Sequence, residues 1–426
     1  MNLVLRPASE MKDSGVEWIG KTPIEWRITK ISNEYEVQLG KMLGSKELKG
    51  AELKDYLRAA NVFWGKFDLE EVKQMYILPS EKEAFSIRSG DLLVCEGGDV
   101  GRAAIWKGEI EDCYIQNSLH RIRPRSNNAT NRYLYYILYA ASSRGEMEAV
   151  SSKATIAHYT LIKVKRTKIP IPLGEVQEKI ARYLDAETSK IQQLIATKTK
   201  QIQLLQEYEK SLIHHAVTKG LDPKAKMKDS RVEWIGKMPN NWTTQRFKYM
   251  CDYKKGKAPA VFLDAASTNT LPYLEMEYLR EQSEPKYTTL SDNSVTVNDG
   301  DILLLWDGSK AGEFITGKKG ILSSTMARIS EKKKKHLLRY IVKSFEPVLV
   351  DLTNGMGIPH VRSEVLMNIR VPVIPDNEDK QIAAYLDSET SKIYRVINTI
   401  ETQITKLEEY RKSLIYEVVT GKVRVS

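Results

Sequence analysis

The sequence predicts an α/β (α+β) fold in which two mixed domains are separated by two long antiparallel coiled-coil helices, with an internal two-fold pseudo-symmetry. Two observations predict this fold. Two sequence blocks each occur twice in the 426 residues, and two stretches carry the heptad spacing of apolar residues that is typical of paired helices. The expected order is a domain at 1–172, a helix at 173–222, a second domain at 223–375 and a second helix at 376–426.

The repeat defines the two halves of the chain. Residues 11–26 read MKDSGVEWIGKTPIEW and residues 227–242 read MKDSRVEWIGKMPNNW, with twelve identities in sixteen positions. Residues 180–191 read IARYLDAETSKI and return at 382–393 as IAAYLDSETSKI, with ten identities in twelve. The first pair lies 216 residues apart and the second 202, so the interiors differ by 14 residues. This pattern indicates one constant frame that carries two different recognition surfaces.

Within each predicted domain, short apolar runs lie between turn signals. Gly-Asp pairs at 90–91 and 300–301 precede the runs LLVC and ILLLW, which predict buried strands. Proline-rich segments follow at 168–172 and 370–375, and they predict the end of a strand before each long helix begins.

The long helices are predicted from apolar residues that recur at steps of three, four or seven along one face. Each helix of about 40 residues would be about 60 Å long at 1.5 Å per residue, which is too long to bury its stripe within one small domain. We therefore expect the two helices to pair with each other. A dimerisation coiled coil with no further role is the alternative, although a homodimer would need only one copy. The predicted seam consists of Leu184, Ile191, Ile195, Lys198, Ile202, Leu205 and Leu212 in the first helix, and Leu386, Ile393, Ile397, Ile400, Ile404, Leu407 and Leu414 in the second.

Composition narrows the class of function. Hydrophobic residues make up 42% of the chain and charged residues 28%, which is typical of a globular protein. No apolar run approaches the roughly 18–20 residues that span a bilayer, so we expect a cytoplasmic protein that makes no membrane contact. The net charge of +10 favours a polyanionic partner, because lysine and arginine side chains neutralise phosphates.

Motifs of catalysis are missing from the sequence. The chain contains no G-x-x-x-x-G-K-[ST] phosphate loop, no G-x-G-x-x-G motif and no Asn-Pro-Pro-aromatic or Asp-Pro-Pro-aromatic tetrad of an amino-methyltransferase. Three cysteines and six scattered histidines have no metal-ligand spacing. We therefore expect no catalytic, cofactor-binding or metal-binding residues and a chain that is not an enzyme.

Taken together, these residues resemble the specificity subunit of type I restriction-modification systems. The resemblance rests on the W-I-G-x-x-P-x-x-W opening of each half, on YLRAANVFWGKFDL at 56–69 and on the repeated I-A-x-Y-L-D that opens each long helix. It implies two target recognition domains that each read one half of an asymmetric, bipartite double-stranded DNA sequence, with the helices as a spacer. It also implies two methyltransferase subunits that use S-adenosylmethionine, and optionally two restriction subunits that use ATP and magnesium. On this view the chain itself binds no cofactor.

The candidate DNA contacts are basic and polar residues near glycine turns, together with the repeated histidines. Sequence is read through base edges, whereas phosphate contacts fix position, so each domain needs a few variable side chains on a basic frame. A solvated surface role is the alternative for each lysine, and a framework role for each histidine. The candidates are Lys41, Arg58, Asn61, Arg102, Lys153, His158, Lys257, Lys310 and His360.

Two other functions remain open at this point. One is a coiled-coil adaptor without DNA specificity, and the other is a fused nuclease or methyltransferase with an unrecognised site. A DNA reader should bind more weakly as the salt concentration rises, whereas an adaptor should show no sequence preference.

Overall fold

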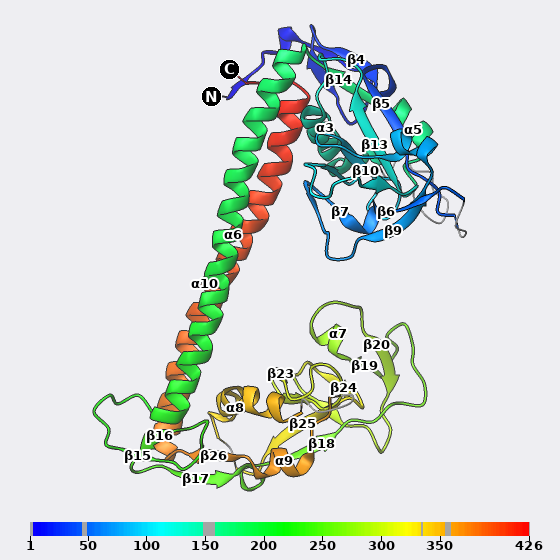
Figure 1. Ribbon diagram of the computed structural model, residues 1–426. Helices are drawn as coiled ribbons and strands as arrows, with labels where there is room; N and C mark the ends of the chain where they lie inside the picture. Colours follow the sequence, from blue (N-terminus) through cyan, green and yellow to red (C-terminus); the bar gives the residue numbers. More distant parts are fainter. Residues whose placement is uncertain (1–2, 45–48, 148–157, 334, 354–358, 426) are drawn as a thin grey trace. The chain divides into compact units, whose positions relative to one another are not determined.

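The fold is a mixture of helices and sheets in which two helices are much longer than the rest, as the computed structural model in Figure 1 shows. These are α6 (Gly174–Lys219) with 46 residues and α10 (Asp376–Val419) with 44 residues. The predicted fold class is therefore confirmed. The structure describes residues 3–44, 49–147, 158–333, 335–353 and 359–425.

The chain forms two compact units, and each long helix belongs partly to both. Unit 1 consists of Met1–Lys198 and Glu401–Ser426, and unit 2 consists of Thr199–Ile400. Helix α6 therefore begins in unit 1 and ends in unit 2, whereas α10 begins in unit 2 and ends in unit 1.

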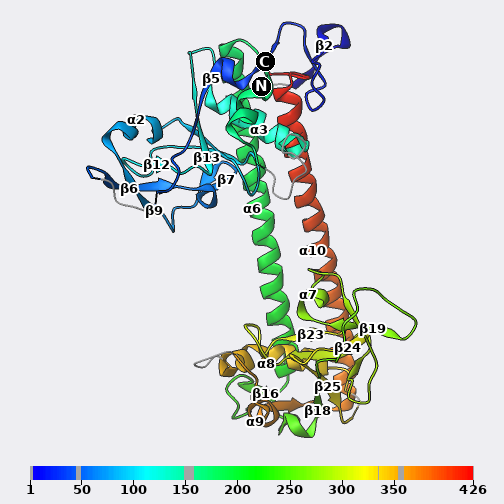
Figure 2. The ribbon, with the colours of Figure 1, turned by 90° about the vertical axis from the view of Figure 1, so that its right-hand side faces the viewer.

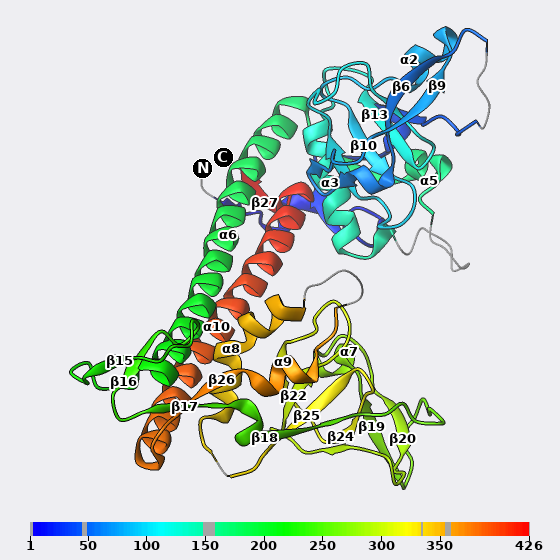
Figure 3. The same ribbon diagram turned by 60° about the horizontal axis from the view of Figure 1, so that its bottom comes forward.

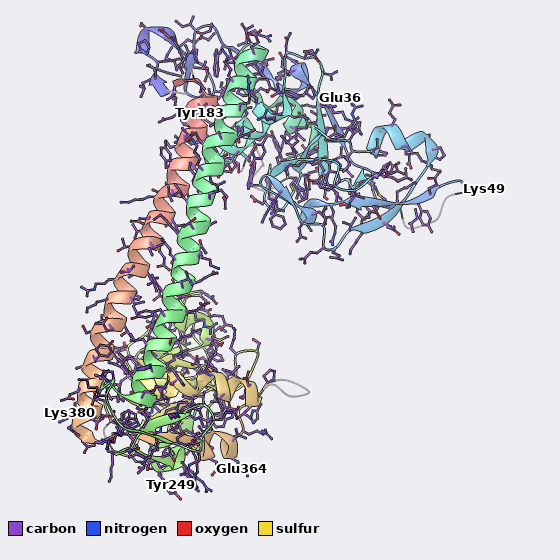
Figure 4. The ribbon with its side chains drawn as sticks, turned by 60° about the vertical axis from the view of Figure 1, so that its left-hand side comes forward. Glu36, Lys49, Tyr183, Tyr249, Glu364 and Lys380 are labelled. Carbon is purple, nitrogen blue, oxygen red and sulfur yellow. The ribbon has the colours of Figure 1, made fainter. Side chains whose placement is uncertain are left out.

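The two long helices pair in antiparallel fashion and run side by side in Figures 1 and 3. In unit 1, Arg411 Nη1 donates a hydrogen bond of 3.1 Å to Gln192 Oε1, and Lys198 Nζ donates one of 2.5 Å to Gln403 Oε1. The residue number rises along α6 while it falls along α10, so the pair is antiparallel as predicted. Tyr183, on the first turns of α6, lies beside the last turns of α10 (Figure 4).

The predicted seam is buried to different extents along the pair. The end of each helix packs into the core of a unit, where apolar neighbours surround it on several sides. Buried members are Leu184, Ile191, Leu386, Ile393, Ile397, Ile400 and Leu414, and partly buried members are Ile195, Lys198, Ile202, Leu205, Leu212, Ile404 and Leu407.

Unit 1 is built around an antiparallel four-stranded sheet of order β11-β10-β13-β5. Helix α3 shares the main hydrophobic core with this sheet and with the long helices (Figure 2). A second sheet has the order β12-β6-β9. The strands are β5 (Tyr35–Leu39), β6 (Glu52–Leu57), β9 (Lys73–Ile77), β10 (Leu92–Cys95), β11 (Ala103–Ile105), β12 (Tyr114–Ile115) and β13 (Leu119–Pro124), and α3 is Asn131–Ser143.

Smaller elements complete unit 1. Strand β1 (Leu3–Leu5) pairs with β27 (Val423–Val425), so the last strand of the chain belongs to the first unit. This pairing differs from the predicted division, which placed the whole C-terminal segment in a helix. The remaining elements are β2 (Met11–Asp13), β3 (Lys21–Pro23), β4 (Arg27–Lys30), β7 (Val62–Phe63), β8 (Lys66–Phe67), β14 (Lys168–Ile171), α1 (Ile31–Glu34), α2 (Lys82–Phe85) and α5 (Leu161–Arg166), with 3₁₀ turns η1 (Ala8–Glu10), η2 (Ala59–Asn61) and η3 (Pro79–Glu81).

Unit 2 repeats this plan with a four-stranded sheet of order β18-β25-β22-β23 and a second sheet of order β20-β19-β24-β21. Helices α8 and α9 lie beside the first sheet (Figure 3). Its elements are β15 (Met227–Asp229), β16 (Lys237–Pro239), β17 (Thr243–Arg246), η4 (Phe247–Tyr249), β18 (Cys251–Lys255), β19 (Thr270–Leu274), α7 (Met276–Leu279), β20 (Lys286–Thr289), β21 (Thr296–Val297), β22 (Ile302–Leu305), β23 (Phe314–Thr316), β24 (Gly320–Leu322), β25 (Met326–Glu331), α8 (Leu338–Thr353), α9 (Ser363–Asn368) and β26 (Arg370–Val373).

Strand register shows that the variable middles share one frame. Leu92 of β10 faces Ile122 of β13, and Ile302 of β22 faces Ile329 of β25 in the same place of the second sheet. The short parallel pair β6–β12 has its counterpart in β19–β24. Positions in one unit can therefore be matched to positions in the other even where the sequences have diverged.

The repeated I-A-x-Y-L-D stretch holds each domain helix against a long helix. Tyr136 of α3 donates a hydrogen bond of 2.6 Å to Asp185 Oδ1 of α6, and Arg132 forms an ion pair with the same carboxylate. In unit 2, both Arg339 and Tyr340 of α8 contact the Asp387 carboxylate of α10. The aspartate of the repeat is thus an anchoring residue.

Candidate nucleic-acid interface

In unit 1, four chain segments meet at one end of the main sheet. Antiparallel pairing places the last residues of β5 and β10 next to the first residues of β13. Gly40 N–H donates to Leu119 O (3.0 Å), and Tyr159 N–H donates to Glu96 O (2.7 Å). We call the segments 40–41, 96–97, 116–118 and 158–159 the recognition end of unit 1.

Unit 2 has the same arrangement, held by the corresponding backbone hydrogen bonds. Gly256 N–H donates to Met326 O (2.9 Å), and Val361 N–H donates to Trp306 O (2.9 Å). We call the segments 256–257, 306–308, 323–325 and 359–361 the recognition end of unit 2. Because both ends are built from the same backbone frame, they differ mainly in the side chains that they display.

Two glycines allow the chains to cross closely at these ends. A Cβ on Gly40 would lie 2.7 Å from Ile115 O, and one on Gly256 would lie 2.7 Å from the carbonyl carbon of Ser323. Only glycine fits so close a backbone approach. Lys41 and Lys257, which follow these glycines, therefore lie at equivalent positions of the two recognition ends.

Two candidates of unit 1, Lys41 and His158, lie in its recognition end, and Arg58, Asn61 and Arg102 lie in segments next to it. Several of these candidates form ion pairs. Lys41 pairs with Glu81, and its side chain is largely buried. Arg58 Nη2 lies 2.7 Å from Glu71 Oε2, and this glutamate is well exposed. Glu71 is exposed, so a phosphate or a base edge can replace it beside Arg58, whereas the Lys41–Glu81 pair is mostly enclosed.

Asn61, by contrast, has a structural role. Its side chain is 4% exposed, Oδ1 accepts from Arg58 N–H (3.1 Å), and Nδ2 donates to Asp68 O (2.9 Å) and Glu71 O (3.0 Å). The amide is used in holding the turn after β6, so we remove Asn61 from the set of candidate contacts. A buried polar side chain with its hydrogen bonds satisfied has little left for an outside ligand.

Arg102 joins the glycine turn to the neighbouring hairpin. Its Nη2 donates to Ala59 O (3.0 Å), and its guanidinium lies 5.0 Å from the centroid of the Phe63 ring. Phe63 is 37% exposed, so a cation and an aromatic ring are offered side by side near the recognition end.

The lysines of unit 2 are more exposed than Lys41. Lys257 Nζ donates to Asn293 Oδ1 (3.3 Å), and Lys310 Nζ lies 3.3 Å from Glu313 Oε1 with about half of its side chain exposed. A hollow of about 300 Å³ opens beside Lys310. Residues that line it include Glu275, Asp307, Lys310, Ser323, Ser324 and Thr325.

One pair of equivalent positions carries opposite charges. Leu57 and Leu274 occupy the same register position in the two parallel strand pairs. The next residue is Arg58 in unit 1 and Glu275 in unit 2. Next to their recognition ends, units 1 and 2 therefore offer a hydrogen-bond donor and a hydrogen-bond acceptor, respectively, at one matched point.

The two predicted histidines occupy equivalent positions but have different neighbours. His360 Nδ1 lies 2.6 Å from Asp307 Oδ1, and Lys255 Nζ donates to Asp307 Oδ2 (2.7 Å). Partial burial alone would raise the pKa of Asp307, but these hydrogen bonds and charges outweigh it and hold the pKa below its usual value. At His158, the corresponding neighbour is Gly97.

The matches with known sequences follow the same two-part plan. A family described as "Type I restriction modification DNA specificity domain" matches residues 23–204 and 239–407, which together exceed half of the chain. The chain belongs to this family. Its two matches fall on the two halves that the structure shows to share one frame, so each half is one copy of the specificity domain.

Relatives and a solved structure agree with this assignment. The MjaVIII specificity subunit of Methanocaldococcus jannaschii is 41% identical over 190 residues, which is 44% of this chain and 44% of that protein. The chain thus spans less than half of this relative. The putative MjaX specificity subunit of the same organism is 23% identical over 418 residues, which is 96% of each protein.

The fold itself is also found in a solved structure described as the basis of complex assembly and conformational transition of the type I R-M system. One chain of it has a TM-score of 0.70 with 16% identity, covering 94% of this chain and 99% of that chain. At this identity the likeness shows the fold alone.

Within the described part of this specificity-family chain, other reactive groups are few. No group of three or more His, Cys, Asp or Glu residues is placed to hold a metal ion, and no helix is long and apolar enough to cross a membrane. Cys95, Cys113 and Cys251 are buried free thiols. Burial raises the pKa of Cys95 to about 11, and that of the other two to about 12, so these thiols stay protonated.

The sequence candidates and the residues that the structure places around the recognition ends overlap only in part. Lys153 lies outside the described residues. Lys255, Glu275 and Asp307 were missed, because their positions match unit 1 only through strand register and not through sequence identity. A search of the strand ends for charged residues would have found Lys255 and Asp307.

Proposed function

We propose that this chain is the DNA sequence-specificity subunit of a type I restriction-modification complex and that it binds an asymmetric bipartite DNA target. The recognition end of each unit reads one half-site. One observation supports the proposal: the two units share one backbone frame at and beside the recognition end but display different side chains on it, such as Arg58 against Glu275.

The physical argument follows from how DNA is read. Lysines at matched positions, Lys41 and Lys257, suit contacts to phosphates, which fix position without reading sequence. Side chains that differ between the units suit base edges in the major groove, where each base pair presents a distinct pattern of donors and acceptors. Two different reading surfaces predict two different half-sites and hence a target that is not palindromic.

Partner subunits supply the chemistry in this proposal. Two methyltransferase subunits carry S-adenosylmethionine, and a complete complex adds up to two restriction subunits with ATP and magnesium. The chain itself binds none of these cofactors, has no catalytic role and works in the cytoplasm, where the DNA is. The long helices set the spacing between the half-sites.

The test is a genome-wide map of methylated bases after co-expression of the chain with the methyltransferase subunit encoded beside it, in a host without other DNA modification. The expected result is one bipartite motif with a fixed gap, which disappears when the chain is omitted. A contiguous motif that persists without the chain would contradict the proposal.

Two further functions remain as alternatives, and each predicts a different result. A coiled-coil adaptor would form a complex with the methyltransferase without directing it to any motif, and complex formation would depend little on salt. The purified chain alone, incubated with DNA, magnesium and S-adenosylmethionine, would cut or methylate DNA if it were a fused enzyme. A sequence reader should instead bind DNA in a manner that weakens steeply between low and physiological salt.

A further inference from the structure

Asp307 and His360 are fixed opposite each other by the backbone at the recognition end of unit 2. The two residues form an antiparallel β-bridge. Gly308 N–H donates to Pro359 O (3.0 Å) on one side of the bridge, and Val361 N–H donates to Trp306 O (2.9 Å) on the other. Directly opposed residues of an antiparallel pair project their side chains from the same face, so these two side chains are neighbours by construction.

The side-chain contacts fix the orientation of the imidazole ring. Asp307 Oδ1 lies 2.6 Å from His360 Nδ1, and Oδ2 accepts a hydrogen bond of 2.7 Å from Lys255 Nζ. An ionised carboxylate only accepts hydrogen bonds, so Nδ1 carries the hydrogen. The other ring nitrogen, Nε2, makes no hydrogen bond within the described part of the chain, and half of the side chain is exposed.

Two stacked aromatic side chains lie beside the Asp307–His360 pair. The Trp306 ring stacks on Tyr253 with centroids 4.7 Å apart and an interplanar angle of 25°. Lys255 Nζ lies 5.7 Å from the Trp306 centroid, and the His360 ring meets the same indole edge-on at 6.4 Å. The imidazole is therefore held by a carboxylate and by a rigid aromatic surface, while Nε2 is left for an outside partner.

Unit 1 has the histidine without the elements that hold it. His158 occupies the position of His360, since Tyr159 N–H donates to Glu96 O as Val361 N–H does to Trp306 O. Gly97 stands where unit 2 has Asp307, and a Cβ built on Gly97 would lie 3.4 Å from His158 Nδ1.

The other supports are missing from unit 1 as well. By the strand register, the position of Lys255 is occupied by Leu39, and that of Trp306 by Glu96. Among the described residues, a histidine held by a carboxylate hydrogen bond is therefore found at this position in unit 2 and not in unit 1.

We propose that His360 specifies one base pair of the half-site read by unit 2, with Nε2 as the contacting atom and Asp307 as the positioning residue. His158 has no such role in unit 1. The proposal rests on the proposed function, because it assigns a contact within the DNA interface. A side chain held in one orientation loses little conformational freedom on binding, which favours a base contact over a loose phosphate contact.

The experiment compares methylated-base maps for single variants of the full chain, each co-expressed with the methyltransferase subunit. Asp307→Gly reproduces the local sequence of unit 1, and His360→Ala removes the reading group. Both should relax the same single position of the same half-site, by about tenfold in discrimination, as expected for the loss of one hydrogen bond to a base edge. The other half-site should remain unchanged.

Two controls separate positioning from folding. Asp307→Asn keeps an oxygen that accepts a hydrogen bond from His360 Nδ1, so this variant should retain the motif of the unaltered chain. If Asp307 acted only through its negative charge, Asp307→Asn would relax the motif instead. His158→Ala is the matched test in unit 1 and should not relax a single base position of either half-site, whereas His215→Ala, at an exposed position outside both recognition ends, is the control and should leave the motif unchanged. Thermal unfolding of each purified complex checks that the variants remain folded.

The results distinguish this inference from the proposed function. If the unaltered chain directs no bipartite motif, the proposed function itself fails. If the motif appears but Asp307→Gly and His360→Ala leave every position intact, or weaken both half-sites equally, the assignment of His360 is overturned while the proposed function stands. Relaxation of the motif by His158→Ala would contradict the claimed difference between the units.

Discussion

Gly40 and Gly256 show how a single residue determines the geometry of a recognition end. Each glycine lies where its segment crosses the backbone just before β13 in unit 1 or just before β25 in unit 2. This crossing places the lysine that follows the glycine. The 216-residue offset of the first repeat aligns these glycine–lysine pairs in the sequence. This alignment could not show that the glycines are needed for a close backbone approach, because the opposing residues, Gln116 and Ser323, lie far away in the sequence.

We expect Gly40→Ala and Gly256→Ala each to destabilise the chain by about 1–3 kcal/mol, because the added methyl group would overlap backbone atoms that can move only with the strand. Urea unfolding measures the change. Gly44→Ala is the control, since no atom of the described residues lies within 4 Å of a Cβ built on Gly44, and the change should be nearly neutral. Equal stability of all three variants would contradict this account of the crossing.

His120 gives unit 1 a sensitivity to acid. It is fully buried in β13, and Nε2 donates to Tyr159 O (2.8 Å) while Nδ1 has no partner within the described residues. Burial lowers the pKa of His120 to about 4, although the hydrogen bond to the carbonyl opposes this. By register, the matching residue of unit 2 is Ala327.

Stability should therefore fall as the pH decreases from about 6.5 to about 4, because the unfolded histidine binds a proton in this range and the folded one does not. The full effect is about 3 kcal/mol, and it levels off below pH 4. Thermal unfolding between pH 7 and pH 4 measures it. His120→Gln should reduce the slope, whereas His215→Gln, at an exposed position, should leave it unchanged. An identical slope in the His120 variant would refute the assignment.

Gln177 and Asp379 occupy matching positions and both accept a backbone hydrogen bond, although their residue types differ. Gln177 Oε1 accepts from Thr130 N–H (3.2 Å), and Asp379 Oδ2 accepts from His336 N–H (2.9 Å) at the same place in unit 2. Both side chains are buried. A different residue type thus accepts a backbone hydrogen bond from the segment just before the domain helix in each unit, so a comparison of letters alone suggests that the position has lost its role.

At the scale of elements, the heptad pattern predicted the long helices and their antiparallel pairing, and both are confirmed. The domain helices α3 and α8 were not predicted. The carboxylate that anchors each of them lies on a long helix, so the sequence around α3 or α8 does not contain its anchoring residue. The repeated aspartate was visible as a motif, but its contacts with Arg132 and Arg339 depend on the folded chain.

The spacer role of the helices can be tested by lengthening both of them. Four residues inserted after Thr199 in α6 and four after Ile400 in α10 add about 6 Å to each helix and rotate it by about 400°, which is close to a whole turn and keeps the seam in phase. We expect the gap of the methylated motif to grow by about two base pairs, at 3.4 Å each, with both half-sites preserved.

A single inserted residue at each of these points is the control. It rotates the following segment by about 100°, so the apolar seams no longer face each other and the complex should lose activity. If the four-residue insertion leaves the gap unchanged, the helices do not set the spacing.

At the scale of the whole molecule, the order of elements is circular: the segment after α10 returns to the first unit, just as the segment after α6 enters the second. In unit 2 the end of α6 runs into the hairpin β15–β16, and in unit 1 the end of α10 runs into β27, which pairs with β1. Gly421 at the end of α10 lies close to Pro23 and Trp26, and Gly220 at the end of α6 lies close to Trp242. The sequence repeat showed two copies, but the partner of the C-terminal strand was not predictable, because three-residue strands carry too little pattern.

A circularly permuted chain should therefore fold and direct the same motif. The original ends, which β1 and β27 bring together (Figure 2), would be joined by a short flexible linker, and new ends would be opened in the exposed segment at 222–224. Co-expression with the methyltransferase and mapping of methylated bases give the result. New ends placed at Thr199, inside α6, are the control and should abolish the motif, whereas loss of the motif in the first permutant would contradict the circular order.

The shared frame of the two units has a consequence for inheritance. In a symmetric dimer made of one repeated chain, any mutation in the reading surface alters both half-sites at once, and the unaltered target is lost in a single step. Here each reading surface has its own codons. Recombination within the constant helices can exchange one surface and leave the other in place, so a population that holds a modest collection of surfaces can assemble many different targets by pairing them.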